Sequence, residues 1–123
     1  MRSMMIRATG LAVLAAILTM TTISGFADAV GGPKQATFRL DANSYTTFNA
    51  RFVGGRAARI ALKGDGDTDL DLFIYDQNGR LVAQDNDNSD LCLVEWVPLW
   101  TGNFTIKVVN QGGVYNDFVI VTN

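Results

Sequence analysis

The chain has 123 residues, with ten Lys and Arg, twelve Asp and Glu, one Cys and no His. This length accommodates one domain, and the lack of His excludes Ser-His-Asp and Cys-His catalytic sites and the usual zinc ligand sets. The slight acidic excess and the scattered basic residues argue against nucleic acid or an anionic membrane as a partner, because both bind a basic face.

The first 29 residues have the pattern of a secretory signal peptide. Arg2 and Arg7 precede an apolar run from Gly10 to Ile23, and Ala27-Asp28-Ala29 forms a small-residue cleavage site. We therefore expect export to the periplasm or the cell exterior, cleavage before Val30, and no membrane contact after the signal peptide is removed. An N-terminal anchor that stays uncleaved is the alternative interpretation.

After a short linker at residues 30–35, apolar and polar residues alternate almost to the C-terminus. This period of two, broken at short intervals by Gly, Pro, Asn and Asp, predicts short β-strands and no long helix. Asp76-Gln-Asn-Gly79 predicts a tight hairpin turn, since Asn and Gly tolerate positive φ angles. The strands are expected near residues 36–40, 45–53, 57–63, 69–75, 80–84, 91–97, 103–110 and 118–122.

About eight strands at this spacing predict an all-β domain over residues 36–123, folded as an antiparallel β-sandwich or a small barrel. Cys92 is the only cysteine, which excludes a disulfide within the chain. Because Cys92 lies in the apolar run Leu91–Val94, we expect a buried small hydrophobic residue rather than a reactive thiol.

Acidic residues gather between Asp65 and Asp90, where Arg80 is the only basic residue. A hairpin at Asn78-Gly79 would bring the second half of this segment back to the first and crowd carboxylates at one end of the sandwich. Like charges at close range repel, and Ca²⁺ binds about six to eight oxygen ligands from such loops. The candidate calcium ligands are Asp65, Asp67, Asp69, Asp71, Asp85, Asp87 and Asp90.

Two other interpretations of these aspartates stay open. In one of them, the aspartates cap turns and keep the surface soluble. The segment is also no EF-hand loop, because Leu70 stands where that loop requires Gly. Asp69 with Asp87 could in principle form a glycosidase pair, but nothing in the spacing selects two acids. We therefore expect no enzyme activity.

Aromatic residues suggest a second candidate site. Trp96 and Trp100 flank Pro98, and Tyr115 follows later in the chain. Exposed Trp and Tyr side chains stack on sugar rings or peptides, so Trp100 and Tyr115 are candidate ligand-binding residues. The alternative is that Trp96 fills the core and Trp100 covers the end of the sandwich.

The segment Gly64–Asp76 (GDGDTDLDLFIYD) resembles the bacterial pre-peptidase C-terminal domain family, and the resemblance extends over about Phe38 to Asn123. It also rests on Asn78-Gly79, Leu81-Val-Ala83, Ser89-Asp90, Trp96-Val-Pro98, Thr101-Gly102, Val108–Asn110, Tyr115-Asn116 and Thr122-Asn123. The resemblance implies a non-catalytic jelly-roll β-sandwich attached to exported enzymes. It also implies similarity to the collagen-binding domains of bacterial collagenases, some of which bind calcium.

The expected function is thus that of a secreted, non-catalytic accessory or binding module. We expect a monomer that binds an extracellular polymer or a secreted protein, with calcium as its one cofactor. The alternative function is that of a structural envelope or matrix protein that self-associates through its edge strands and exposed aromatic residues.

Overall fold

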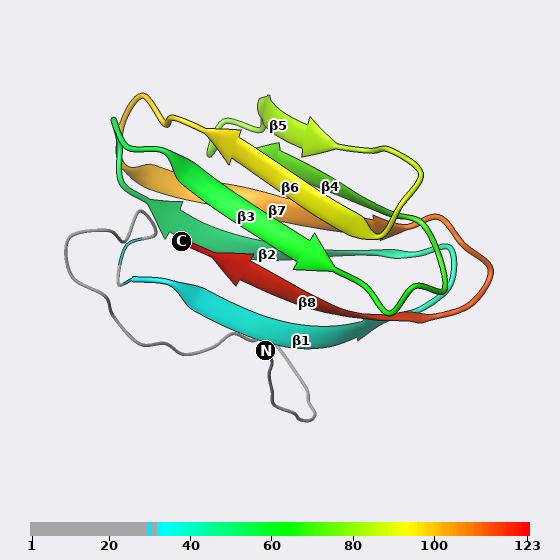
Figure 1. Ribbon diagram of the computed structural model, residues 1–123. Helices are drawn as coiled ribbons and strands as arrows, with labels where there is room; N and C mark the ends of the chain where they lie inside the picture. Colours follow the sequence, from blue (N-terminus) through cyan, green and yellow to red (C-terminus); the bar gives the residue numbers. More distant parts are fainter. Residues whose placement is uncertain (1–29, 31) are drawn as a thin grey trace.

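The computed structural model describes residue 30 and residues 32–123, which form two four-stranded antiparallel sheets packed face to face (Figure 1). One sheet has the strand order β1-β8-β3-β6 and the other the order β2-β7-β4-β5. This is the strand order of a jelly roll, so the predicted all-β sandwich is confirmed. The predicted signal peptide, residues 1–29, lies outside the described residues, among which no helix could cross a membrane.

All the predicted strands are present, with boundaries that differ by about two residues at most. β1 begins inside the predicted linker because Lys34 and Gln35 already pair with Thr122 and Val121 of β8. The strands are β1 (Lys34–Leu40), β2 (Tyr45–Phe52), β3 (Ala58–Lys63), β4 (Leu70–Tyr75), β5 (Leu81–Asp85), β6 (Leu91–Trp96), β7 (Gly102–Asn110) and β8 (Asn116–Thr122).

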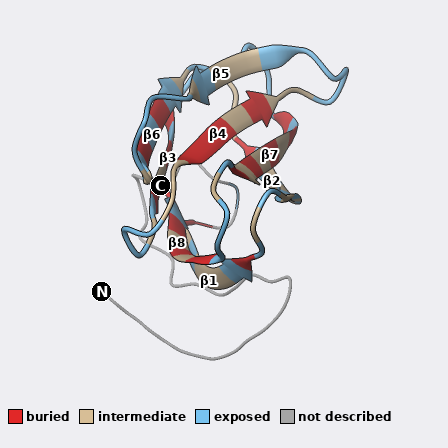
Figure 2. Cartoon of the chain, turned by 90° about the vertical axis from the view of Figure 1, so that its right-hand side faces the viewer, coloured by how far each residue is buried: buried red, intermediate tan, exposed pale blue. Residues whose placement is uncertain are grey.

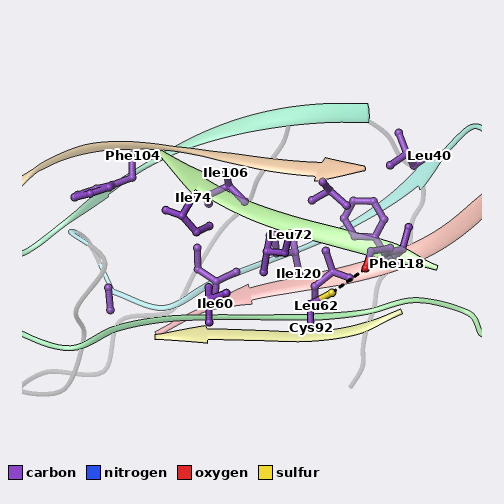
Figure 3. Close-up of a cluster of buried hydrophobic side chains, with 14 of the residues drawn as sticks. Leu40, Ile60, Leu62, Leu72, Ile74, Cys92, Phe104, Ile106, Phe118 and Ile120 are labelled. Atoms are coloured by element: carbon purple, nitrogen blue, oxygen red, sulfur yellow. Dashed lines mark hydrogen bonds between the residues drawn. The ribbon is translucent and has the colours of Figure 1, made fainter. Parts of the chain in front are cut away.

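The core lies between the two sheets and is built from alternate residues of the strands. Leu70, Leu72 and Ile74 of β4 have no exposed surface, and Figure 3 shows Leu72 and Ile74 facing Ile60 of the opposite sheet. Successive side chains of a strand point to opposite faces, which is why the period of two predicted these residues. Full burial of each such side chain contributes about 1.5–3 kcal/mol to folding.

Aromatic side chains fill the space between the sheets near both ends of the core. The ring centroids of Phe38 in β1 and Phe48 in β2 lie 4.5 Å apart. At the other end, the Trp96 indole lies edge-to-face with Phe52 and Phe104, at centroid distances of 5.1 and 5.4 Å. Trp96 therefore packs against the core, as the second interpretation of that residue predicted.

Because successive strands run in opposite directions, their connections lie at only two ends of the sandwich (Figure 1). We call one the acidic end; it holds the loops at residues 41–44, 64–69, 86–90 and 111–115. Figure 2 faces this end and shows exposed loops around buried strand residues. The opposite end holds the loops at residues 53–57, 76–80 and 97–101.

The Cys92 thiol provides a test of the core. Its side chain is fully buried, and Sγ donates a hydrogen bond to the Leu70 carbonyl oxygen at 3.2 Å (Figure 3). Burial is the main cause that raises the pKa of Cys92 to about 12, and only the thiolate is a good nucleophile. We expect the native protein not to react with a disulfide reagent at mildly alkaline pH, and to react fully in denaturant. Rapid labelling of the folded protein would place Cys92 outside the core.

Candidate functional site

The β4–β5 hairpin brings the two acidic segments together, as predicted. Its turn is closed by a hydrogen bond from the Gly79 N–H to the Asp76 carbonyl oxygen at 3.0 Å, with Gly79 at a φ of 82°. Two backbone hydrogen bonds then join the β3–β4 and β5–β6 loops. The Gly64 N–H donates to the Asp90 carbonyl oxygen at 2.8 Å, and the Leu70 N–H donates to the Ser89 carbonyl oxygen at 3.2 Å.

The buried amide of Asn116, at the start of β8, holds these two loops in place. Its Nδ2 donates to Thr68 Oγ1 at 3.0 Å and to Asp90 Oδ2 at 3.2 Å, and its Oδ1 accepts from the Asp65 N–H at 3.0 Å. Gly64 packs so closely that a Cβ there would clash with Asn116 and Asp90. One side chain thus hydrogen-bonds to two other side chains and to the backbone of a third residue at the acidic end.

Asn110, at the end of β7, does the same for the other two loops of this end. Its Nδ2 donates to the carbonyl oxygens of Leu40 and Val114 at 3.1 and 2.9 Å, and its Oδ1 accepts from the Gly112 N–H at 2.9 Å. Neither Asn was predicted from the sequence to have a role. The signal for one was the two-residue alternation along each strand, which places Asn110 and Asn116 at inward-facing positions. A buried amide must be hydrogen-bonded.

Four of the seven predicted calcium ligands accept hydrogen bonds from backbone N–H groups, at distances of 2.6–3.2 Å. Three of them accept from loop residues, as turn capping, the alternative interpretation, predicted: Asp65 from Asp67, Asp87 from Ser89, and Asp90 from Gly66. Asp65 also accepts from Asp117 in β8. Asp85 instead accepts from Leu93, so it joins the end of β5 to β6.

Asp69 and Asp71 differ from the other candidates because each has a buried Oδ1 with no hydrogen-bond partner in the described part of the chain. Asp71 lies on the outer face of β4, yet it is only 6% exposed, and its Oδ2 accepts a hydrogen bond from Gln111 Nε2 at 2.8 Å. Burying a carboxylate oxygen without a partner is costly. Such an oxygen calls for a proton or a cation. Asp67, by contrast, is exposed.

Charge repulsion acts at the same place. Burial is the main cause that raises the pKa of Asp69 above 3.8, and repulsion by Asp71, Asp87 and Asp90 adds to it. Within residues 30 and 32–123, however, no three acidic or Cys side chains are already arranged to hold a metal ion. The two carboxylates with a free buried oxygen to offer a cation are Asp69 and Asp71.

The two predicted ligand-binding aromatics do not form one site. Trp100 precedes β7 and Tyr115 follows it, so they lie at opposite ends of a strand that spans about 30 Å. Trp100 is 53% exposed and lines a hollow of about 220 Å³ with Arg80. Tyr115 is 45% exposed, but the Arg39 guanidinium covers its ring at 3.9 Å from the centroid.

Comparison with known proteins assigns no family to this arrangement, because no protein-family model and no curated protein matches the chain. The resemblance to pre-peptidase C-terminal domains therefore stays a prediction. The evidence on function is therefore the chemistry of the residues at the two ends of the sandwich.

Substituting Asn116→Asp tests the role of the buried amide. The new carboxylate would face Asp90 Oδ2 at hydrogen-bond distance and could no longer donate to Thr68 or Asp90. We expect a loss of about 2–4 kcal/mol in the free energy of unfolding at neutral pH, measured by urea denaturation. Asn103→Asp, at an exposed position of β7 near the opposite end, should change it by less than about 0.5 kcal/mol. Equal midpoints for the two variants would contradict the role of Asn116.

Substituting Asp69→Asn tests whether this carboxylate is under electrostatic strain. In a chelator at neutral pH, the variant should melt above the wild type, because it removes a charge that burial and three carboxylates disfavour. A raised folded-state pKa costs stability above that pKa and none below the unfolded value. The advantage should therefore disappear as the pH falls towards 3.8. Melting curves by circular dichroism, with Asp67→Asn as the exposed control, would reveal a destabilised Asp69→Asn if the strain were absent.

Proposed function

We propose that this domain is a non-catalytic binding module of an exported protein, stabilised by a calcium ion at the acidic end. The observation that carries the proposal is the pair of buried oxygens, Asp69 Oδ1 and Asp71 Oδ1, that have no hydrogen-bond partner among the described residues. Asp69 immediately precedes β4 and Asp71 is the second residue of that strand, so the two carboxylates are close along the chain.

The chemistry of the oxygens favours a hard divalent cation over other metals. Carboxylate oxygens are the ligands that Ca²⁺ binds, whereas softer metals prefer His and Cys. The chain has no His, and Cys92 is fully buried in the core. When bound, calcium would neutralise the repulsion around Asp69. Water molecules would complete the coordination of the ion. We therefore expect the Kd for Ca²⁺ to be about 10⁻⁴–10⁻³ M, as in extracellular calcium-binding modules.

Two observations support a role without catalysis. The capping aspartates of the acidic end accept backbone hydrogen bonds, which commits them to loop structure rather than to proton transfer. The hollows of about 220 and 430 Å³ that flank the β4–β5 turn lie at the opposite end, away from Asp69 and Asp71. A binding role agrees with the resemblance to pre-peptidase C-terminal domains. We propose an extracellular polymer or a secreted protein as the partner class.

The edge of β6 favours a monomer over a self-associating structural protein. Two of its N–H groups, which strand addition would need, are already occupied by side chains. The Leu91 N–H donates to Ser89 Oγ at 3.1 Å, and the Leu93 N–H donates to Asp85 Oδ2 at 2.9 Å. Asp85 therefore occupies an N–H group at the edge of β6. Its sequence position had predicted a calcium ligand instead.

Calcium titration of the purified protein tests the proposal. About 10 mM Ca²⁺ should stabilise the wild type by roughly 1–3 kcal/mol relative to the protein in chelator, which thermal melting and calorimetric titration both detect. Asp69→Asn and Asp71→Asn should lose this gain, and the exposed control Asp67→Asn should keep it. Asn is used in place of Ala because the amide oxygen introduced by Asp71→Asn can still accept from Gln111.

The stability difference between Asp69→Asn and the wild type should change sign when calcium is added. Asp69→Asn should be more stable than the wild type in chelator and less stable than it in calcium. No calcium-dependent shift in the wild type, or an equal shift in all three variants, would overturn the metal site.

A further inference from the structure

The β6–β7 loop exposes large apolar side chains at the opposite end of the sandwich. Val97 is 58% exposed, Leu99 is 85% exposed and Trp100 is 53% exposed, whereas Pro98 between them is buried. Single exposed apolar residues are common, but a group of them on one protruding loop marks an interaction surface.

The neighbouring β2–β3 loop holds this exposed loop in place. The Gly55 N–H donates to the Pro98 carbonyl oxygen at 2.7 Å, and the Gly54 N–H donates to Thr101 Oγ1 at 2.9 Å. Gly54 packs so closely that a Cβ there would lie 2.5 Å from the Trp100 backbone. The apolar side chains are therefore presented by a fixed backbone, which cannot turn them inward without breaking these contacts.

Basic residues surround the same loop, although they are scattered along the sequence. Arg80 lines the hollow beside Leu99 and Trp100. Arg51 lies near the end of β2, and Arg56 follows Gly55 in the loop that holds Pro98. Two acidic residues also lie here: Asp76, which lines the same hollow, and Glu95, which pairs with Arg59. The other described acidic residues lie at the acidic end, in its loops or at the adjoining ends of strands: Asp41, Asp65, Asp67, Asp69, Asp71, Asp85, Asp87, Asp90 and Asp117.

The N-terminal segment joins the sandwich at this same end. The Val30 N–H donates to the Arg51 carbonyl oxygen at 2.7 Å, and Lys34 Nζ donates to the Val30 carbonyl oxygen at 2.7 Å. The N-terminus expected after cleavage before Val30 therefore lies at the same end as the exposed apolar loop.

We propose that the Val97–Trp100 loop and the arginines around it dock the domain on an anionic lipid bilayer. The loop protrudes, which suits insertion between lipid headgroups, and Trp prefers the interface between water and hydrocarbon. Arg side chains beside it attract lipid phosphates. This surface differs from the calcium site in place and chemistry, so it goes beyond the proposed function. It also reverses the expectation of no membrane contact, because the fold gathers basic residues that the sequence separates.

Vesicle binding tests the proposal on the protein purified in its exported, processed form. All measurements are made in chelator, so that bridging by calcium contributes nothing and the outcome is independent of the proposed metal site. The protein should co-sediment with vesicles of phosphatidylcholine and phosphatidylglycerol. It should bind pure phosphatidylcholine more weakly, and added salt should weaken its binding to the anionic vesicles.

Matched variants locate the binding surface. Leu99→Ser and Trp100→Ser should each lower the partition coefficient about tenfold, because the apolar side chain no longer enters the lipid. Leu93→Ser is the control, since Leu93 is 64% exposed on β6, away from the β6–β7 loop. Arg80→Gln should weaken binding to anionic vesicles and leave binding to neutral ones unchanged.

Trp fluorescence gives an independent measurement of insertion. The chain has two Trp residues, and Trp96 packs against the core, so a blue shift and quenching by brominated lipid would report on Trp100. Three results would each overturn the proposal: no binding to anionic vesicles at low salt, equal loss for Leu93→Ser and Leu99→Ser, or an unchanged Trp spectrum in bound protein. The first result would favour a protein or saccharide as the ligand of the opposite end.

Discussion

The alternation of strand direction in the jelly roll is the constraint on which the rest of the structure depends. Eight strands that reverse at every turn leave connecting loops at only two ends. Residues in alternate loops therefore meet although some 20 residues separate them, and residues in consecutive loops lie at opposite ends. This is how Asp65–Asp71 and Asp85–Asp90 come together while the Asp76–Gly79 turn between them lies at the opposite end.

Gathering carboxylates at one end creates a cost that the buried amides help to offset. Asn116 and Asn110 hold four loops together through hydrogen bonds of 2.9–3.0 Å, and the carboxylates of Asp65 and Asp90 accept hydrogen bonds from backbone N–H groups. A fully satisfied buried polar network rigidifies the structure around it. Only Asp69 and Asp71 keep buried carboxylate oxygens without a partner in the described residues, so the remaining strain is concentrated where a cation can relieve it.

The sequence predicted the strands and the meeting of the acidic segments because both depend on local rules. Alternation places Leu72 and Ile74 in the core whatever strands they pair with, and the hairpin at Gly79 forces the chain to return. The hydrogen bond that Asp71 accepts comes from Gln111, which lies forty residues further along and reaches it through the pairing of β4 with β7. No local pattern encodes that contact.

The sequence also predicts how far apart two residues lie when a single strand separates them. Trp100 and Tyr115 flank a single predicted strand, which already places them at opposite ends of the sandwich and not in one compact site. By contrast, the edge contact between Asp85 and the Leu93 N–H required knowing that β5 and β6 belong to different sheets. The gathering of Arg51, Arg56 and Arg80 likewise follows from the order of strands within the sheets, which composition and spacing do not determine.

The separation of charge also explains how an acidic chain could approach an anionic surface. With a formal net charge of −2, the protein as a whole should be repelled. Electrostatic interactions in water decay over about 8 Å at physiological ionic strength, whereas the two ends lie about 30 Å apart along β7. A bilayer that meets the Trp100 loop therefore interacts with the nearby arginines and with Asp76, which lines the same hollow, and hardly at all with the aspartates of the acidic end. Local charge, set by topology, decides the encounter, and the net charge that the sequence displays does not.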